Sequence, residues 1–135
     1  MFIPPLIADS NIFVAAGFNR DSASRRIIDA IERRDLVQVW NDQTRRETLH
    51  VVRKIPPLNR DIVEPLFRDD GYYPKPTEPA DFEIIDDEGD RKFAALAKSC
   101  AVILVSNDSD FLAVRDKLDI SVLRPSAFVQ RVAAI

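Results

Sequence analysis

The chain of 135 residues has little cysteine, histidine and glycine, and each scarcity excludes a class of site. Its one cysteine cannot form an intrachain disulfide, so a reducing, cytoplasmic setting is expected. One cysteine and one histidine cannot supply the ligand cluster of a zinc site. The three glycines, Gly17, Gly71 and Gly89, lie too far apart in the sequence to form a phosphate-binding loop.

Long hydrophobic runs are also missing. No stretch approaches the roughly 18 apolar residues of a membrane span, and the opening MFIPPLIADSN has neither the charged leader nor the apolar run of a signal peptide. We therefore expect no membrane association. The length and the 46% of hydrophobic residues suit one compact domain with its own core, which we expect to span residues 1–135.

An excess of basic charge is absent, since the net charge is −3, and this argues against a generic nucleic-acid-binding protein. The distribution is uneven, however. Residues 1–60 hold ten Lys and Arg against seven Asp and Glu, whereas residues 61–135 hold nine against fifteen. The pattern indicates either ordinary solvated helix faces or a basic rim beside an acidic, metal-binding pocket.

Apolar runs and capping residues predict alternating strands and helices. Strands are expected at residues 6–8, 36–40, 82–85, 101–105 and 119–125. Helices are expected after Ser22 or Ser24, from Asn41 or Asp42 to about residue 54, and at residues 59–67, 90–99, 110–117 and 126–132. Residues 69–81, DDGYYPKPTEPAD, predict a loop. This alternation predicts an α/β sandwich around a mostly parallel sheet.

Four carboxylates stand out in this arrangement. Asp9 directly follows the first strand, and Asp108 follows the buried strand AVILV within three residues. In parallel sheets ligands bind beyond the carboxyl ends of the strands, so the two acids share one crevice if their strands are neighbours. Glu47 lies on the apolar side of its helix, and Asp90 begins the next one. Taken singly, each acid also fits a structural role as a helix cap, a turn residue or half of an ion pair.

Convergence of Asp9, Glu47, Asp90 and Asp108 would require a cation. Two carboxylates about 5 Å apart repel by roughly 3 kcal/mol at an effective dielectric near 20. Ligation by oxygen alone suits Mg²⁺ or Mn²⁺. Such a site can polarise a phosphate, activate a water and stabilise a leaving oxygen.

At these residues the chain resembles the PIN-domain family of metal-dependent ribonucleases. ADSNIFVAA resembles the opening strand of the family, with its acid at Asp9 and an asparagine at Asn11. TRRETLHVVRKI resembles the helix that carries the second acid, here Glu47. GDRKFAALAKSCAVILVSNDSDFL resembles the longest signature, which falls on Asp90, Ser106 and Asp108. The closing RPSAFVQRV is similar to that of the toxin-like branch.

The resemblance implies a fold, an activity and partners. The fold would be a three-layer sandwich with five parallel strands flanked by helices. The activity would be Mg²⁺- or Mn²⁺-dependent cleavage of single-stranded RNA, frequently as the toxin of a VapBC-like toxin–antitoxin pair. A small antitoxin chain and a homodimer are the implied protein partners.

The resemblance also assigns roles. Asp9, Asp90 and Asp108 would hold the principal cation, and Glu47 would complete the site directly or through water. Asp110 would be an auxiliary acid. Asp87 is the alternative to Asp90, which we favour because it lies three residues before Phe93, where the apolar stripe of its helix begins. The positioning residues would be Asn11 and Ser106, and the RNA-contacting residues Arg25, Arg26, Arg45 and Arg46.

Two other classes of function remain open from sequence. A PIN-like module could bind protein or RNA without catalysis, in which case Asp9→Asn would leave its activity unchanged. A phosphoacceptor signalling domain also gathers carboxylates at strand ends. It would want an acidic pair after the first strand and a lysine after a late one, whereas Ser10 and Asn11 follow Asp9, and Arg124 ends the last predicted strand.

Overall fold

The structure, a computed structural model, describes residues 2–132. Four strands form one parallel sheet in the order β2-β1-β3-β4. Their bounds are β1 Pro5–Ala8, β2 Val37–Gln38, β3 Leu104–Val105 and β4 Val122–Leu123. In register, Pro5 pairs with Val37 across β1 and β2, and Ile7 pairs with Leu104 across β1 and β3. The chain thus places β2 on one side of β1 and crosses to place β3 on the other.

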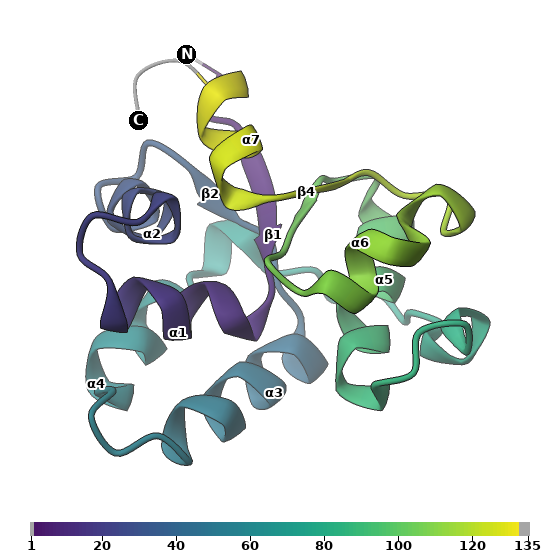
Figure 1. Ribbon diagram of the computed structural model, residues 1–135, viewed down its shortest axis with the longest axis horizontal. Coiled ribbons are helices and arrows are strands. Elements are labelled where there is room, and N and C mark those ends of the chain that lie inside the picture. The colour runs from purple at the N-terminus through teal and green to yellow at the C-terminus, as the bar shows by residue number, and fades with distance from the viewer. Residues whose placement is uncertain (1, 133–135) are drawn as a thin grey trace.

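Helices flank the sheet on both sides (Figure 1). They are α1 Ser10–Phe18, α2 Ala23–Glu32, α3 Asp42–Arg53, α4 Arg60–Val63, α5 Glu88–Cys100, α6 Ser109–Val114 and α7 Pro125–Arg131. Single 3-10 turns lie at Glu64–Leu66, Asp69–Gly71, Pro79–Phe82 and Arg115–Lys117. Within residues 2–132 no helix has the length and apolarity to cross a bilayer.

The sheet separates two apolar cores, and β1 contributes to both because successive side chains of a strand point to opposite faces. Leu6 and Ala8 pack with residues of α1, α2 and α7 in the first core. Ile7 packs with α5, α6 and the segment before α5 in the second core. The molecule is therefore a three-layer α/β sandwich, as the sequence predicts.

The predicted fifth strand at residues 82–85 is wrong, because this segment is helical rather than extended. Pro79–Phe82 forms a 3-10 turn, and the Ile85 N–H donates to the Phe82 carbonyl at 3.0 Å. Phe82 and Ile85 are both buried in the core around α5. Their spacing of three residues brings both side chains to one side of a helical turn, whereas in a strand they would point to opposite faces.

Helix α1 is the element for which the sequence analysis made no prediction. Its sequence SNIFVAAGF is apolar nearly all round, so it has no amphipathic period to detect. It begins at Asp9, whose carboxylate accepts from the Ile12 N–H at 3.3 Å. The other N-caps follow the sequence more plainly, with Ser22 before α2 and Asn41 before α3.

The loop predicted at residues 69–81 is confirmed as lacking long helices and strands, and side chains fasten its start to the edge of the sheet. The indole N–H of Trp40 donates to the Arg68 carbonyl at 2.7 Å. Gly71 lies so close to β2 that a Cβ there would be 1.7 Å from the Gln38 carbonyl oxygen. Any other residue at position 71 would therefore displace the backbone.

The end of α5 generates a prediction about stability. Ala101 ends this helix with φ 55° and ψ 41°, the left-handed conformation that glycine adopts without steric cost. Because Ala101 is exposed, Ala101→Gly removes no packing. We expect it to raise the free energy of unfolding by about 1 kcal/mol, measured by urea denaturation.

Ala113→Gly is the matched control. Ala113 is also exposed but lies inside α6, where glycine costs about 1 kcal/mol relative to alanine. The two substitutions should therefore move the urea midpoint in opposite directions. A decrease with both would contradict the left-handed cap.

Candidate active site

The candidate site lies where the order of the sheet reverses. From β1 the chain first adds β2 on one side and later adds β3 on the other, so a crevice opens beyond the carboxyl ends of β1 and β3. Asp9 follows β1, and Ser106 to Asp108 follow β3. Asp9 and Asp108 can share one crevice only if their strands are neighbours, and β1 and β3 are neighbours.

Asp9 is almost completely buried, with 1% of its surface exposed. Its backbone N–H continues the sheet by donating to the Val105 carbonyl at 3.2 Å, while its carboxylate caps α1. The backbone on both sides is thus fixed, and the carboxylate has one orientation. Burial raises the pKa of Asp9 to about 6, although hydrogen bonds from Ser106 and the Ile12 N–H oppose the shift.

Ser106 connects Asp9 to Asp108. Its side chain is fully buried, and its hydroxyl donates to Asp9 Oδ2. The Ser106 hydroxyl oxygen also accepts from the Asp108 backbone N–H at 2.9 Å. One small hydroxyl side chain therefore fixes both the Asp9 carboxylate and the backbone that presents Asp108.

Asp108 is the N-cap of α6, and its Oδ1 accepts from the Asp110 N–H at 2.8 Å. Asp110 is exposed in the first turn of α6, and its backbone rather than its carboxylate makes the hydrogen bond to Asp108. The structure thus gives Asp108 a fixed place and leaves Asp110 at the rim.

Asp90 comes from the first turn of α5. Its Oδ2 is buried and has no hydrogen-bond partner within residues 2–132. Burial, the hydrogen bond with Asp108 and repulsion from the charge of Asp108 raise the pKa of Asp90 to about 8, with smaller repulsion from Asp87 and Asp9. Asp90 therefore faces Asp9 and Asp108. We call these three residues, Asp9, Asp90 and Asp108, the acidic cluster.

Asp87, the alternative to Asp90, has a different place. It is exposed and caps α5 by accepting from the Gly89 N–H at 2.9 Å. Its carboxylate has a backbone partner, whereas Asp90 has a buried oxygen with no hydrogen-bond partner in the part of the chain that the structure describes. The geometry therefore favours Asp90 as the member of the cluster.

Glu47 reaches the same helix end from α3. A Cβ on Gly89 would lie 2.0 Å from Glu47 Oε1, and Glu47 Oε2 lies 3.9 Å from Lys92 Nζ. Glu47 is therefore turned toward the first turn of α5, one residue from Asp90. The hydroxyls of Ser10 and Thr48, 3.1 Å apart, join α1 to α3 beside it.

Gly89 and Lys92 are the residues that the sequence analysis missed at this place. Gly89 provides room that any side chain would fill, and Lys92 provides a positive charge for Glu47. The position of Gly89 next to an acid and just before an apolar helix face was the available signal.

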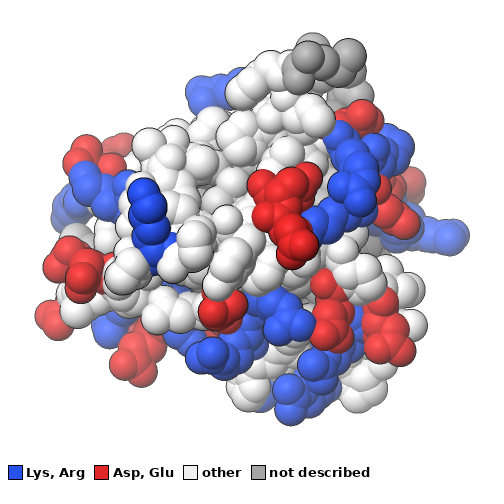
Figure 2. Space-filling model, turned by 180° about the vertical axis from the view of Figure 1, so that it is seen from behind, with Lys and Arg blue, Asp and Glu red and all other residues white. Residues whose placement is uncertain are grey.

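The remaining predicted residues lie farther out. Asn11 is exposed on α1. Of the arginines, Arg25 pairs with Asp29 and Arg45 with Glu64, at 3.0 and 2.8 Å. The side chains of Arg26 and Arg46 are exposed on α2 and α3. Figure 2 shows basic and acidic side chains interspersed on the face seen from behind, so the charges drawn there form no continuous basic surface.

The acidic cluster has the donor chemistry of a hard cation. A buried carboxylate oxygen without a partner and two raised pKa values show that negative charge here is poorly compensated by the described residues. Within residues 2–132 no three acidic, histidine or cysteine side chains are already gathered into a ligand set. The acidic cluster thus matches a hard cation in the type of its donor atoms, and binding of the cation would draw the carboxylates closer together.

Comparison with known families matches the PIN domain to residues 5–110, a range that includes Asp9, Glu47, Asp90 and Asp108. The chain belongs to the PIN domain family. No curated protein matches it in sequence.

Solved structures show the same fold at low identity. FitAcB from Neisseria gonorrhoeae has 18% identity and a TM-score of 0.57, with 90% of this chain and 98% of that chain covered. FitAB bound to an IR36 DNA fragment has 17% identity and a TM-score of 0.57, with 89% and 94% covered. PAE2754 from Pyrobaculum aerophilum has 17% identity and a TM-score of 0.59 over all of both chains.

The raised pKa values generate a prediction about pH. The folded state binds protons more tightly than the unfolded state, in which the pKa of aspartate is near 3.8. The protonated carboxyls of Asp9 and Asp90 therefore contribute fully to the free energy of unfolding below pH 4. This contribution is lost as the pH rises through about 6 for Asp9 and about 8 for Asp90. In EDTA, Asp9→Asn should gain stability relative to wild type between pH 4 and pH 9, by up to about 3 kcal/mol.

Urea denaturation at several pH values measures this difference. The asparagine keeps an oxygen for the Ile12 N–H, so loss of the helix cap does not confuse the result. Asp61→Asn, at an exposed aspartate of α4, is the control and should show no such trend. A difference between Asp9→Asn and wild type that is independent of pH would contradict the raised pKa of Asp9.

Proposed function

We propose that the protein is a Mg²⁺- or Mn²⁺-dependent endoribonuclease that cleaves single-stranded RNA. The observation that carries the proposal is the acidic cluster at the switch point of the sheet, where Asp90 keeps a buried oxygen without a hydrogen-bond partner among the described residues. Membership of the PIN domain family and the resemblance of the acid-bearing motifs to its ribonucleases support it.

The acids and Ser106 have distinct roles in the proposal. Asp9, Asp90 and Asp108 hold the principal ion, Glu47 completes its surroundings and Asp110 assists from the rim. When bound, the ion polarises the scissile phosphate and lowers the pKa of an attacking water. Ser106 keeps Asp9 and the backbone of Asp108 in place, and Asn11, exposed on α1, is the second positioning residue.

Binding of RNA requires positive charge around an acidic centre, because phosphates would otherwise be repelled. We assign this role to Arg25 and Arg26 on α2 and to Arg45 and Arg46 on α3. Arg25 and Arg45 are already paired with carboxylates, so their contribution requires exchange of Asp29 and Glu64 for phosphate.

The biological role in the proposal is that of the toxin in a toxin–antitoxin pair. The similarity in fold to FitAcB and FitAB and the toxin-like closing segment support it. A small antitoxin chain would then be the protein partner. The protein would form a homodimer and would act in the cytoplasm.

The activity can be tested with a pool of single-stranded RNAs incubated with purified protein in Mg²⁺, Mn²⁺ or EDTA. We expect wild type to cleave only with metal. Asp9→Asn and Asp90→Asn should each lose about 100-fold or more in rate, because each removes a carboxylate that the reacting centre needs. Gel electrophoresis of the fragments measures both effects.

Asp61→Asn serves again as the matched control and should cleave like wild type. Circular dichroism should show that Asp9→Asn and Asp90→Asn remain folded. Equal cleavage by wild type and Asp9→Asn would contradict the assignment of the site. Absence of cleavage together with absence of Mg²⁺ and Mn²⁺ binding by calorimetry would contradict the function and favour a binding module.

A further inference from the structure

A cavity lies where the end of α1, the start of α2 and the start of α7 meet, and it adjoins the acidic cluster through Asn107, the residue before Asp108. Its volume is about 360 Å³, within the range of small-ligand pockets. The described residues that line it carry no formal charge. One lining residue, Phe18, is aromatic. Most of the others offer hydroxyl or amide groups: Asn19, Ser22, Ser24, Asn107 and Ser126.

Asn107 links this cavity to the acidic cluster. It stands between Ser106, which holds Asp9, and Asp108. Its amide Nδ2 donates to the buried hydroxyl of Ser24 at 3.3 Å, which ties the loop after β3 to the first turn of α2. The loop that presents Asp108 therefore also forms one wall of the cavity.

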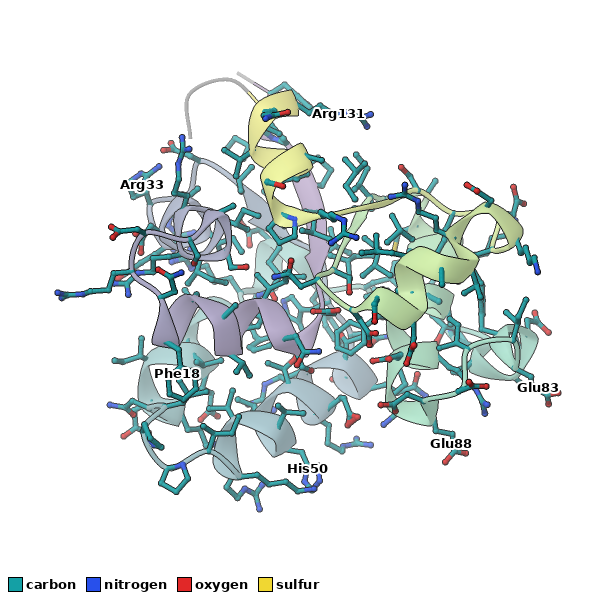
Figure 3. All side chains as sticks on the ribbon, in the orientation of Figure 1. Phe18, Arg33, His50, Glu83, Glu88 and Arg131 are labelled. Carbon is teal, nitrogen blue, oxygen red and sulfur yellow. The ribbon has the colours of Figure 1, made fainter. Side chains whose placement is uncertain are left out.

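Phe18 supplies an aromatic surface at the rim. It is the last residue of α1, and 60% of its surface is exposed although it is a large apolar side chain. In Figure 3 it lies at the end of α1, and Glu88 marks the start of α5, the helix that carries Asp90. A single-stranded RNA that crosses the acidic cluster from α5 toward α1 would thus pass from acidic side chains to an aromatic one.

We propose that this cavity is a nucleotide subsite in which the base next to the scissile phosphate stacks on Phe18. The inference rests on the proposed nuclease function and adds the residues that hold the substrate beside the reacting centre. Unpaired bases stack on aromatic side chains with little regard to sequence, and their edges form hydrogen bonds with amides and hydroxyls. The walls of the cavity offer both kinds of contact.

The neutral lining explains how a polyanion is held so close to several carboxylates. A pocket with acidic walls would add repulsion to that of the cluster, whereas hydroxyl and amide groups do not. The N-terminal turn of α2, a helix of ten residues, borders the cavity with the hydroxyls of Ser22 and Ser24. Its backbone dipole favours the sugar–phosphate chain over a cationic ligand.

The experiment uses short single-stranded RNAs that carry 2-aminopurine at successive positions, bound to the full chain in EDTA. Fluorescence of 2-aminopurine falls when the base stacks on an aromatic ring. We expect strong quenching at one position in wild type, adjacent to the bond cleaved when Mg²⁺ is added. Phe18→Ala should abolish this quenching and weaken binding about 10-fold, and Phe18→Trp should restore both.

Three further variants sharpen the test. Ile62→Ala is the matched control, because Ile62 is a large apolar side chain with 65% exposure that lines a different surface, between α2 and α4. It should bind like wild type. Ser126→Asp adds a carboxylate to the cavity in the first turn of α7, where a negative charge suits the helix. It should weaken binding while the protein stays folded, and Ser126→Ala should not.

The outcomes separate this inference from the proposed function. Quenching that depends on Phe18, without cleavage by any preparation, would support stacking of RNA in the cavity and contradict the proposed nuclease function. Metal-dependent cleavage with quenching and KM unchanged in Phe18→Ala would overturn the subsite and leave the nuclease. Failure of wild type to bind any of the RNAs would overturn both.

Discussion

Repulsion between carboxylates that the fold holds away from water is the constraint on which the rest of this structure depends. Asp9 is buried at the end of β1, and Asp90 is raised in pKa by its own burial and by Asp108. Flexible side chains would relieve such repulsion by turning outward. Here they cannot, because Asp9 caps a helix, Asp108 caps another, and both follow strands at the centre of one sheet. The sandwich thus makes ionisation of these carboxyls unfavourable at one point, where a cation would relieve the cost.

The side chain of Ser106 is the smallest part of this arrangement and joins its two halves. Asp9, directly after β1, and Ser106, directly after β3, are 97 residues apart in the sequence. The Ser106 hydroxyl nevertheless connects the Asp9 carboxylate to the backbone of Asp108. The adjoining Asn107 extends the connection to α2 through Ser24. Four consecutive residues, from Val105 to Asp108, therefore order the sheet, the acidic cluster and the neighbouring cavity together.

The sequence predicts the class of fold and the order of the acids because both follow from local patterns. Caps at Ser22 and Asn41 and the apolar run before Ser106 are visible without the structure. The missed features depend on tertiary contacts. Phe82 and Ile85 have the composition of a strand and become helical turns because α5 covers them. Helix α1 has no amphipathic period because both of its sides are apolar, and the place of Gly89 against Glu47 is set by the approach of two helices.

The central claim is that the acidic cluster carries uncompensated charge that a divalent cation relieves. Titration of the Asp90 carboxyl by carbon-detected NMR, first in EDTA and then in saturating Mg²⁺, tests it most directly. The account predicts a pKa of about 8 for Asp90 without metal and a fall to or below its ordinary value of 3.8 with Mg²⁺, since the cation favours the charged form. A pKa near 3.8 in both conditions, or a raised pKa that Mg²⁺ leaves unchanged, would contradict it.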